Sequence, residues 1–149
     1  MNNPAIYSSM HFDIPITLEN TIRWYNKNQG NDNRADMAII DGEKVVAFCG
    51  ITSIDHQVKK GESYYFVHPE LKGKGIGTIA LSLMLSYAFC NLKLNKVYLF
   101  INEDNTPSYR LAEKLGFKLE GRLREEYLTI GNELKDRLYY GLLKQEFIK

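Results

Sequence analysis

Three glycines, Gly73, Gly75 and Gly77, stand at alternating positions between a strand pattern and a helix pattern. The preceding segment, ESYYFV, is rich in aromatic and β-branched residues, which favours a strand. The following apolar residues, from Ile76 to Ala88, recur at the i, i+3, i+4 spacing of a buried helix face. Because glycine weakens helices and strands alike, this junction indicates a backbone that needs unusual conformations or a close approach.

A junction of this kind can bind an anion. Successive backbone N–H groups point into one concavity, and the helix N-terminus adds partial positive charge. Lys72 and Lys74 add cations, and Thr78 in the first helical turn can donate a hydroxyl. The alternative is a tight connection that binds nothing. The spacing excludes a P-loop, which requires GxxxxGK before Ser or Thr, and it does not match the GxGxxG dinucleotide fingerprint.

The rest of the chain predicts one α/β domain with a mixed sheet. Residues 16–29 have the pattern of a helix, and residues 35–54 that of a hairpin that turns at Asp41 and Gly42. Residues 96–101 form another predicted strand. A second helix follows from Pro107 and ends at Gly116, and residues 118–143 form a long hairpin around residues 131 and 132.

The composition indicates an ordinary globular domain. The 149 residues are 44% hydrophobic and 25% charged with a net charge of +1, so there is no electrostatic footprint for nucleic acid. Cys49 and Cys90 are expected to be buried free thiols, and no metal site is indicated. The N-terminus lacks the pattern of a signal peptide, and no apolar run approaches a membrane span. We therefore expect a cytoplasmic protein without a membrane partner.

Two blocks carry a resemblance to a known family. The segment VHPELKGKGIGT, from Val67 to Thr78, resembles the coenzyme-A pyrophosphate loop of the GNAT superfamily of N-acetyltransferases. The segment NTPSYRLAEKLGF, from Asn105 to Phe117, is similar to the segment after that family's fifth strand. The tail resembles the subgroup of ribosomal-protein N-terminal and spermidine acetyltransferases. The resemblance implies a mixed, mostly antiparallel sheet flanked by helices.

The resemblance also implies acetyl-CoA as the acetyl donor and assigns its contacts. The predicted contacts on the glycine loop are Lys72, Gly73, Lys74, Gly75, Ile76, Gly77 and Thr78. Backbone groups of Phe66 and Val67 would stabilise the oxyanion that develops on the thioester. Asn105 and Ser108 would contact the pantetheine arm and the thioester end. Asn105 has the alternative role of a helix N-cap, and it can fill both roles.

The catalytic assignments follow from the same resemblance. Direct attack by an amine requires a base, and Glu62, at the start of the segment ESYYFV, is our candidate. A solvated strand-end charge is the alternative for Glu62, and His56 and His68 are other candidate bases on loops. The family's usual acid is a Tyr, but Ala112 occupies that position. Tyr109, one helical turn earlier, is the predicted substitute, although a packing role is the alternative for it.

The N-terminal segment resembles the family only from the end of its first helix. We therefore expect one acetyltransferase domain over residues 1–149 that lacks the family's first strand and first helix. The strand DMAII would then have an exposed edge, which invites homodimer pairing. The predicted function is acetyl transfer to a primary amine: a small amine, a polyamine, an amino sugar or a protein N-terminus. A non-catalytic acyl-CoA-binding module is the alternative.

Overall fold

The computed structural model describes residues 15–129 and 131–147. Within them, six strands form one sheet in the order β1-β2-β3-β4-β6-β5. The strands are β1 (Ala35–Asp41), β2 (Lys44–Asp55), β3 (Lys60–Val67), β4 (Lys96–Asn102), β5 (Lys118–Leu128) and β6 (Leu134–Leu143). The helices are α2 (Leu18–Asn28), α3 (Ile76–Cys90) and α4 (Thr106–Lys114), with short 3-10 turns η1 (Pro69–Leu71) and η2 (Lys144–Glu146). This confirms the predicted mixed α/β fold.

The predicted hairpins are present, with one difference at the first turn. Asp41 is the last residue of β1 and pairs with Lys44, so the turn itself consists of Gly42 and Glu43. Gly42 has a φ of +62°, a conformation that favours glycine. The turn therefore lies one residue later than the Asp-Gly pair alone predicts. The second hairpin joins β5 to β6, and Asn132 at its tip has a φ of +58°.

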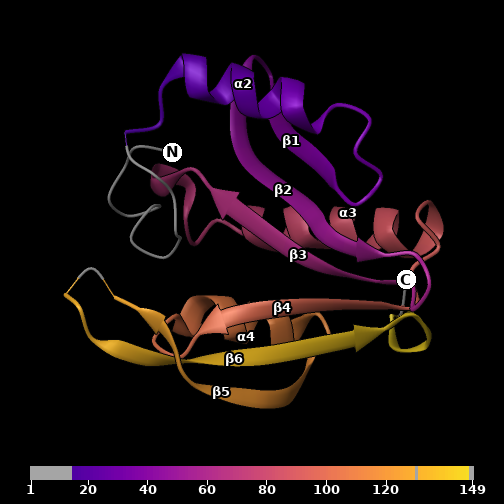
Figure 1. Cartoon of the computed structure of the whole chain (residues 1–149), viewed down its shortest axis with the longest axis vertical. Coiled ribbons are helices and arrows are strands. Elements are labelled where there is room, and N and C mark those ends of the chain that lie inside the picture. The colour runs from indigo at the N-terminus through magenta and orange to yellow at the C-terminus, as the bar shows by residue number, and fades with distance from the viewer. Residues whose placement is uncertain (1–14, 130, 148–149) are drawn as a thin grey trace.

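The two halves of the sheet meet at a single short parallel contact. β3 pairs with β4 only from Lys60 to Glu62, opposite Lys96 to Tyr98. Beyond Glu62 the two strands diverge, as Figure 1 shows between the magenta and orange halves of the sheet. All other neighbouring strands pair antiparallel. Beyond Glu62 the edge of β3 on the β4 side therefore does not pair with β4, and this edge positions the candidate site.

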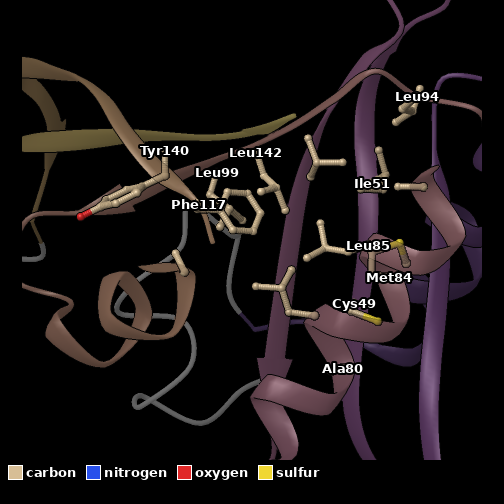
Figure 2. Close-up of a cluster of buried hydrophobic side chains, with 14 of the residues drawn as sticks. Cys49, Ile51, Ala80, Met84, Leu85, Leu94, Leu99, Phe117, Tyr140 and Leu142 are labelled. Carbon is tan, nitrogen blue, oxygen red and sulfur yellow. The ribbon is translucent and has the colours of Figure 1, made fainter. Parts of the chain in front are cut away.

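The core lies between the sheet and the two helices α3 and α4. Helix α3 packs on β2, β3 and β4. Figure 2 shows Ala80, Met84 and Leu85 of this helix against Cys49 and Ile51 of β2, and all five side chains have no exposed surface. A second group, Leu99, Phe117, Tyr140 and Leu142, continues the core under α4. The predicted helix is confirmed, and Ala80, Met84 and Ala88 of its predicted apolar face are buried. Ile79 and Leu83 of that face are about half exposed, which corrects the prediction, because the helix turns its Leu81 and Leu85 side toward the sheet instead.

Helix α2 and strand β1 lie at the border of the described part of the chain. Thr17 caps α2 by accepting a hydrogen bond from the Asn20 N–H at 3.1 Å. The apolar residues of α2 at helical spacing, such as Ile22 and Tyr25, remain about half exposed. β1 is an edge strand of the sheet that the described residues form, as expected for DMAII. The segment that would overturn the exposed-edge hypothesis, residues 1–14, lies outside the described residues.

None of the helices in the described ranges is long and apolar enough to span a membrane.

Candidate functional site

A cavity of about 580 Å³ opens where β3, the glycine loop and α4 meet. Three parts of the chain line it: the end of β3, the loop with the first turn of α3, and α4 with its N-cap. The lining residues are Tyr65, Phe66, Val67, Leu71, Lys72, Gly73, Gly75, Gly77, Thr78, Asn105, Pro107, Ser108, Leu111 and Lys114. Nine of these are among the eleven predicted coenzyme contacts, so the structure brings most of the predicted contacts together in one cavity.

The three glycines serve two different purposes. Gly73 and Gly75 have φ values of +77° and +82°, and a Cβ added to either would meet nothing within 4 Å. They therefore supply left-handed backbone. Gly77 lacks a positive φ, but its added Cβ would lie 3.2 Å from Leu111 Cδ1 and 3.4 Å from Tyr65 Cε2. Gly77 therefore allows α3 to approach both β3 and α4 closely.

The N-terminal end of α3, which carries partial positive charge, faces the cavity and can attract an anion. Gly75 is the N-cap residue and has no side chain to satisfy the first N–H groups. The first helical hydrogen bond runs from the Ile79 N–H to the Gly75 carbonyl at 3.1 Å, so earlier N–H groups have no acceptor within the helix. Thr78, whose N–H is one of these, lines the cavity, and so does Lys72. N–H groups, a cation and a hydroxyl fit a phosphate group.

Beyond Glu62, β3 presents backbone N–H groups on the edge from which β4 has diverged. The His68 N–H donates to Val46 O of β2 at 3.0 Å. Since successive N–H groups of a strand point to opposite sides, the Val67 N–H points away from β2. Val67 also lines the cavity. The position agrees with the oxyanion contact that the family resemblance predicts there.

Side chains of β3 and α4 meet across the cavity. Asn105 is the N-cap of α4, and its side-chain oxygen accepts a hydrogen bond from the Ser108 N–H at 3.4 Å. Both residues line the cavity, so the cap and the cavity wall are one feature. The hydroxyl oxygens of Tyr65 and Ser108 lie 2.9 Å apart. Burial raises the pKa of Tyr65, and its hydrogen bond with Ser108 opposes that shift.

Glu62 lies outside the cavity lining, at the last position where β3 and β4 pair. It is three residues before Tyr65, so the two side chains project from opposite faces of the strand. Burial raises the pKa of Glu62, and the nearby positive charge of Arg137 opposes the shift. A carboxyl group with a raised pKa, beside the point where the strands part, is suited to accept a proton from a molecule approaching from that face.

Three other predicted site residues do not line the cavity. Lys74 and Ile76 belong to the glycine loop, and Ile76 packs against the core instead. The Tyr109 hydroxyl donates to Thr106 Oγ1 at 3.2 Å, and the ring packs against the core. Ala112, which occupies the position of the family's acid, is fully buried. Among the described residues that line the cavity, Tyr65 therefore carries the only phenol.

The sequence prediction missed Tyr65, Leu71, Pro107, Leu111 and Lys114. Period-two alternation along β3 places Tyr65 on the same face as Val67. Helical spacing places Leu111 and the predicted contact Ser108 on one face of α4. Both residues could therefore have been found from the two residues already assigned.

Sequence comparison finds named relatives in bacteria. The chain is 35% identical over 91 residues to the Spermidine N(1)-acetyltransferase of Escherichia coli (strain K12), a match that covers 61% of this chain and 48% of that protein. It is 36% identical over 104 residues to the Putative ribosomal N-acetyltransferase YdaF of Bacillus subtilis (strain 168), covering 68% and 56%. The chain thus spans about half the length of these curated relatives.

Structure comparison agrees on the fold. The spermidine N-acetyltransferase from Vibrio cholerae, solved in complex with CoA and spermine, superposes with a TM-score of 0.92. The superposition covers 99% of this chain and 88% of that one at 23% identity. The family profile described as the Acetyltransferase (GNAT) domain matches residues 1–118. Fold, loop geometry and profile lead to one conclusion: the chain belongs to the GNAT acetyltransferase family.

Proposed function

We propose that this chain binds acetyl-CoA in the cavity beside the glycine loop and transfers the acetyl group to a primary amine. The observation that carries the proposal is the joining of two features in one cavity of about 580 Å³. One is an anion-binding helix start preceded by left-handed glycines, and the other is the edge of β3 beyond its last pair with β4. The pyrophosphate would bind at the first and the pantetheine arm along the second.

The proposed reaction uses the two faces of β3. The thioester end of the donor would lie near Tyr65 and Ser108, with the Val67 N–H available to the developing oxyanion. The acceptor amine would approach from the Glu62 face, where a carboxylate can remove a proton from the amine. Glu62 has the raised pKa that makes such a base effective nearer neutral pH. The glycine loop, which follows the end of β3, would bind the pyrophosphate of the donor.

The relatives of the chain suggest two classes of acceptor amine. Spermidine acetyltransferase and ribosomal N-acetyltransferase relatives support a polyamine and a protein N-terminus, respectively, as acceptors. Near Glu62, the sheet face also carries cations: Lys60 lies 6.0 Å from the Tyr98 ring centre, and Lys96 lies 5.2 Å from that of Tyr139. Lys96 also forms an ion pair with Glu120, so the region near Glu62 carries carboxylates as well as cations and is compatible with a polycation and with a singly charged amine.

The test is release of free coenzyme thiol from acetyl-CoA against a panel of amines. The panel contains spermidine, amino sugars, aminoglycosides and short peptides with free N-termini, and a blank without amine measures hydrolysis. We expect amine-dependent release with one class and a large loss of turnover in Glu62→Gln with coenzyme binding retained. Binding of CoA without turnover would favour the acyl-CoA-binding module. Absence of CoA binding would contradict both functions.

A further inference from the structure

The proposed transfer leaves one requirement without an assigned group, since the departing coenzyme sulfur must gain a proton. The position of the family's acid is Ala112, which is fully buried and has no proton to give. Tyr109 directs its hydroxyl to Thr106 and does not line the cavity. A proton donor has to reach the thioester end of the cavity from another element.

Tyr65 meets that requirement by its position. It lies on β3 between the glycine loop, where a pyrophosphate would bind, and Glu62, where the strands join. The donor must extend along this stretch if its thioester is to reach the acceptor face. The distance along the strand from Glu62 to Tyr65 is about 10 Å, at roughly 3.3 Å per residue. The hydroxyls of Tyr65 and Ser108 form a pair at 2.9 Å in the cavity wall.

The ring of Tyr65 is held from three elements. β3 carries it, the start of α3 packs on it through Gly77, whose absent Cβ would lie 3.4 Å from Tyr65 Cε2, and α4 contacts it through Ser108. A phenol fixed in this way needs little reorganisation to donate a proton. The other hydroxyl at the start of α3, on Thr78, lies at the phosphate end of the cavity.

We propose that Tyr65 is the acid that protonates the departing coenzyme thiolate, in place of the missing phenol at Ala112. This inference rests on the proposed acetyl transfer. The amine nitrogen forms a bond to the carbonyl carbon, the carbon–sulfur bond breaks, and its electron pair goes to sulfur. The phenol proton moves to sulfur. The amine loses one proton through Glu62 to solvent, and the phenolate regains one from solvent through Ser108.

The electrostatic surroundings keep Tyr65 a donor. Burial raises the pKa of the phenol, so it stays protonated at neutral pH. Two charged side chains belong to the cavity wall, Lys72 on the loop and Lys114 at the end of α4, and both are cations that favour formation of the phenolate after transfer. On the opposite face of β3, Glu62 carries the charge of the proposed base. Donor and base are thus separated by the strand.

The test compares wild type with Tyr65→Phe, which removes only the hydroxyl. We expect kcat to fall about 10- to 100-fold, toward the low end of general acid catalysis because a thiol leaves readily. The dissociation constant of CoA, measured by calorimetry, should change less than twofold. The single-turnover rate of wild type should be slower in D₂O, and Tyr65→Phe should lose this isotope effect. Tyr87→Phe, a half-buried tyrosine of α3 outside the cavity, is the matched control.

A second variant keeps the hydroxyl and the shape. Fluorotyrosine at position 65 has a more acidic phenol, which loses its proton at a lower pH. The fall in rate on the alkaline side of the pH–rate profile should therefore begin at a lower pH than in wild type. Unchanged kcat in Tyr65→Phe, or a loss confined to CoA affinity, overturns the assignment of Tyr65 while wild-type turnover preserves the proposed function. Wild type that binds no CoA refutes the proposed function itself, so the two failures are distinguishable.

Discussion

The hydroxyl oxygens of Tyr65 and Ser108 lie 2.9 Å apart and join the edge of β3 to the first turn of α4. Tyr65 lies beyond the last residue of β3 that pairs with β4, so the contact links the two elements where the strands have diverged. It therefore places a polar group from β3 and one from α4 on the same cavity wall. This wall, the glycine loop and the opposite face of β3 should each contribute differently to binding and chemistry.

The glycine loop should respond differently at its two kinds of glycine. Gly75→Ala adds a side chain where nothing lies within 4 Å, but forces a non-glycine residue into a left-handed conformation that costs about 1–2 kcal/mol. Gly77→Ala has no such cost but pushes against Leu111 and Tyr65 in the cavity wall. We expect the melting temperature to fall by about 2–8 °C in Gly75→Ala and less in Gly77→Ala. Thermal shift with and without CoA measures both effects. A lower melting temperature in Gly77→Ala than in Gly75→Ala would contradict this account.

Lys72 should contribute charge to coenzyme binding. We expect Lys72→Ala to weaken CoA binding by about tenfold, near the low end of the roughly 1.5–3 kcal/mol typical of a hydrogen bond to a charged group. Lys74→Ala, in the same loop but outside the cavity lining, should weaken binding less, and the exposed hairpin variant Lys44→Ala should not change it. Calorimetric titration at two salt concentrations checks the order. Equal losses in Lys72→Ala and Lys44→Ala would contradict the assignment.

Asn105 should show its double role in a pair of variants. Asn105→Ala removes the N-cap of α4 and should cost about 1 kcal/mol of folding free energy. Asn105→Asp retains a capping oxygen and should preserve stability, but its negative charge near the donor should weaken CoA binding. Urea unfolding and CoA titration of both variants separate the two roles. If Asn105→Asp were as unstable as Asn105→Ala, the capping role would be refuted.

Glu62 should set the acid side of the pH–rate profile. Because burial raises the pKa of Glu62, its carboxylate forms only at a higher pH than in an exposed glutamate. Turnover should therefore rise as the pH passes through this raised pKa. Arg137 opposes the shift, so Arg137→Gln should move the rise to still higher pH, whereas the exposed Arg124→Gln should not. A profile unchanged by Arg137→Gln would exclude Glu62 as the titrating base.

As the pH rises through the raised pKa of Glu62, activity should increase but the stability of the folded state should decrease. A carboxyl group whose folded pKa is raised favours the folded state at low pH, and this contribution is lost as pH rises through the folded pKa. Glu62→Gln should therefore match or exceed the wild-type melting temperature at neutral pH while losing activity. A clear loss of stability in this variant would indicate a structural role for the carboxylate.

The two cysteines should differ in reactivity, which also affects the thiol assay. Cys49 is fully buried, and burial raises its pKa to about 11. Cys90, which the sequence predicted to be buried, is instead partly exposed, because it lies at the C-terminal end of α3. A thiol reagent at mildly alkaline pH should modify Cys90 quickly and Cys49 only after unfolding. Rapid modification of both in the native chain would contradict the packing of β2 on α3.

The elements that were predictable from the sequence are those with a local signal. The presence of helix α3, the strands and the left-handed Gly116 after α4 depend on neighbouring residues, and the structure confirms them. The buried face of α3 was predicted only in part, since Ile79 and Leu83 are about half exposed. The cap at Asn105 belongs to the same class. The turn between β1 and β2 lies one residue later than predicted, because Asp41 pairs with Lys44 in the sheet instead of taking part in an Asp-Gly turn.

The features that escaped prediction depend on contacts between distant segments. The end of β3–β4 pairing at Glu62 is set by where two strands separated by α3 can meet. Gly77 shows no special backbone angle, and only the approach of Leu111 and Tyr65 explains it. The spacing from Val67 places Tyr65 on the same face of β3, but the contact of its hydroxyl with Ser108 joins two segments that are 43 residues apart. Such contacts can be seen only in the assembled fold.

The measurement that most directly tests acetyl transfer by this chain is mass spectrometry of the amine after reaction with acetyl-CoA. Our account predicts an acetylated amine that appears in step with free coenzyme, and it predicts that Glu62→Gln abolishes most of this product while still binding CoA. Free coenzyme without acetylated amine, or no reaction with any amine although CoA binds, would contradict it.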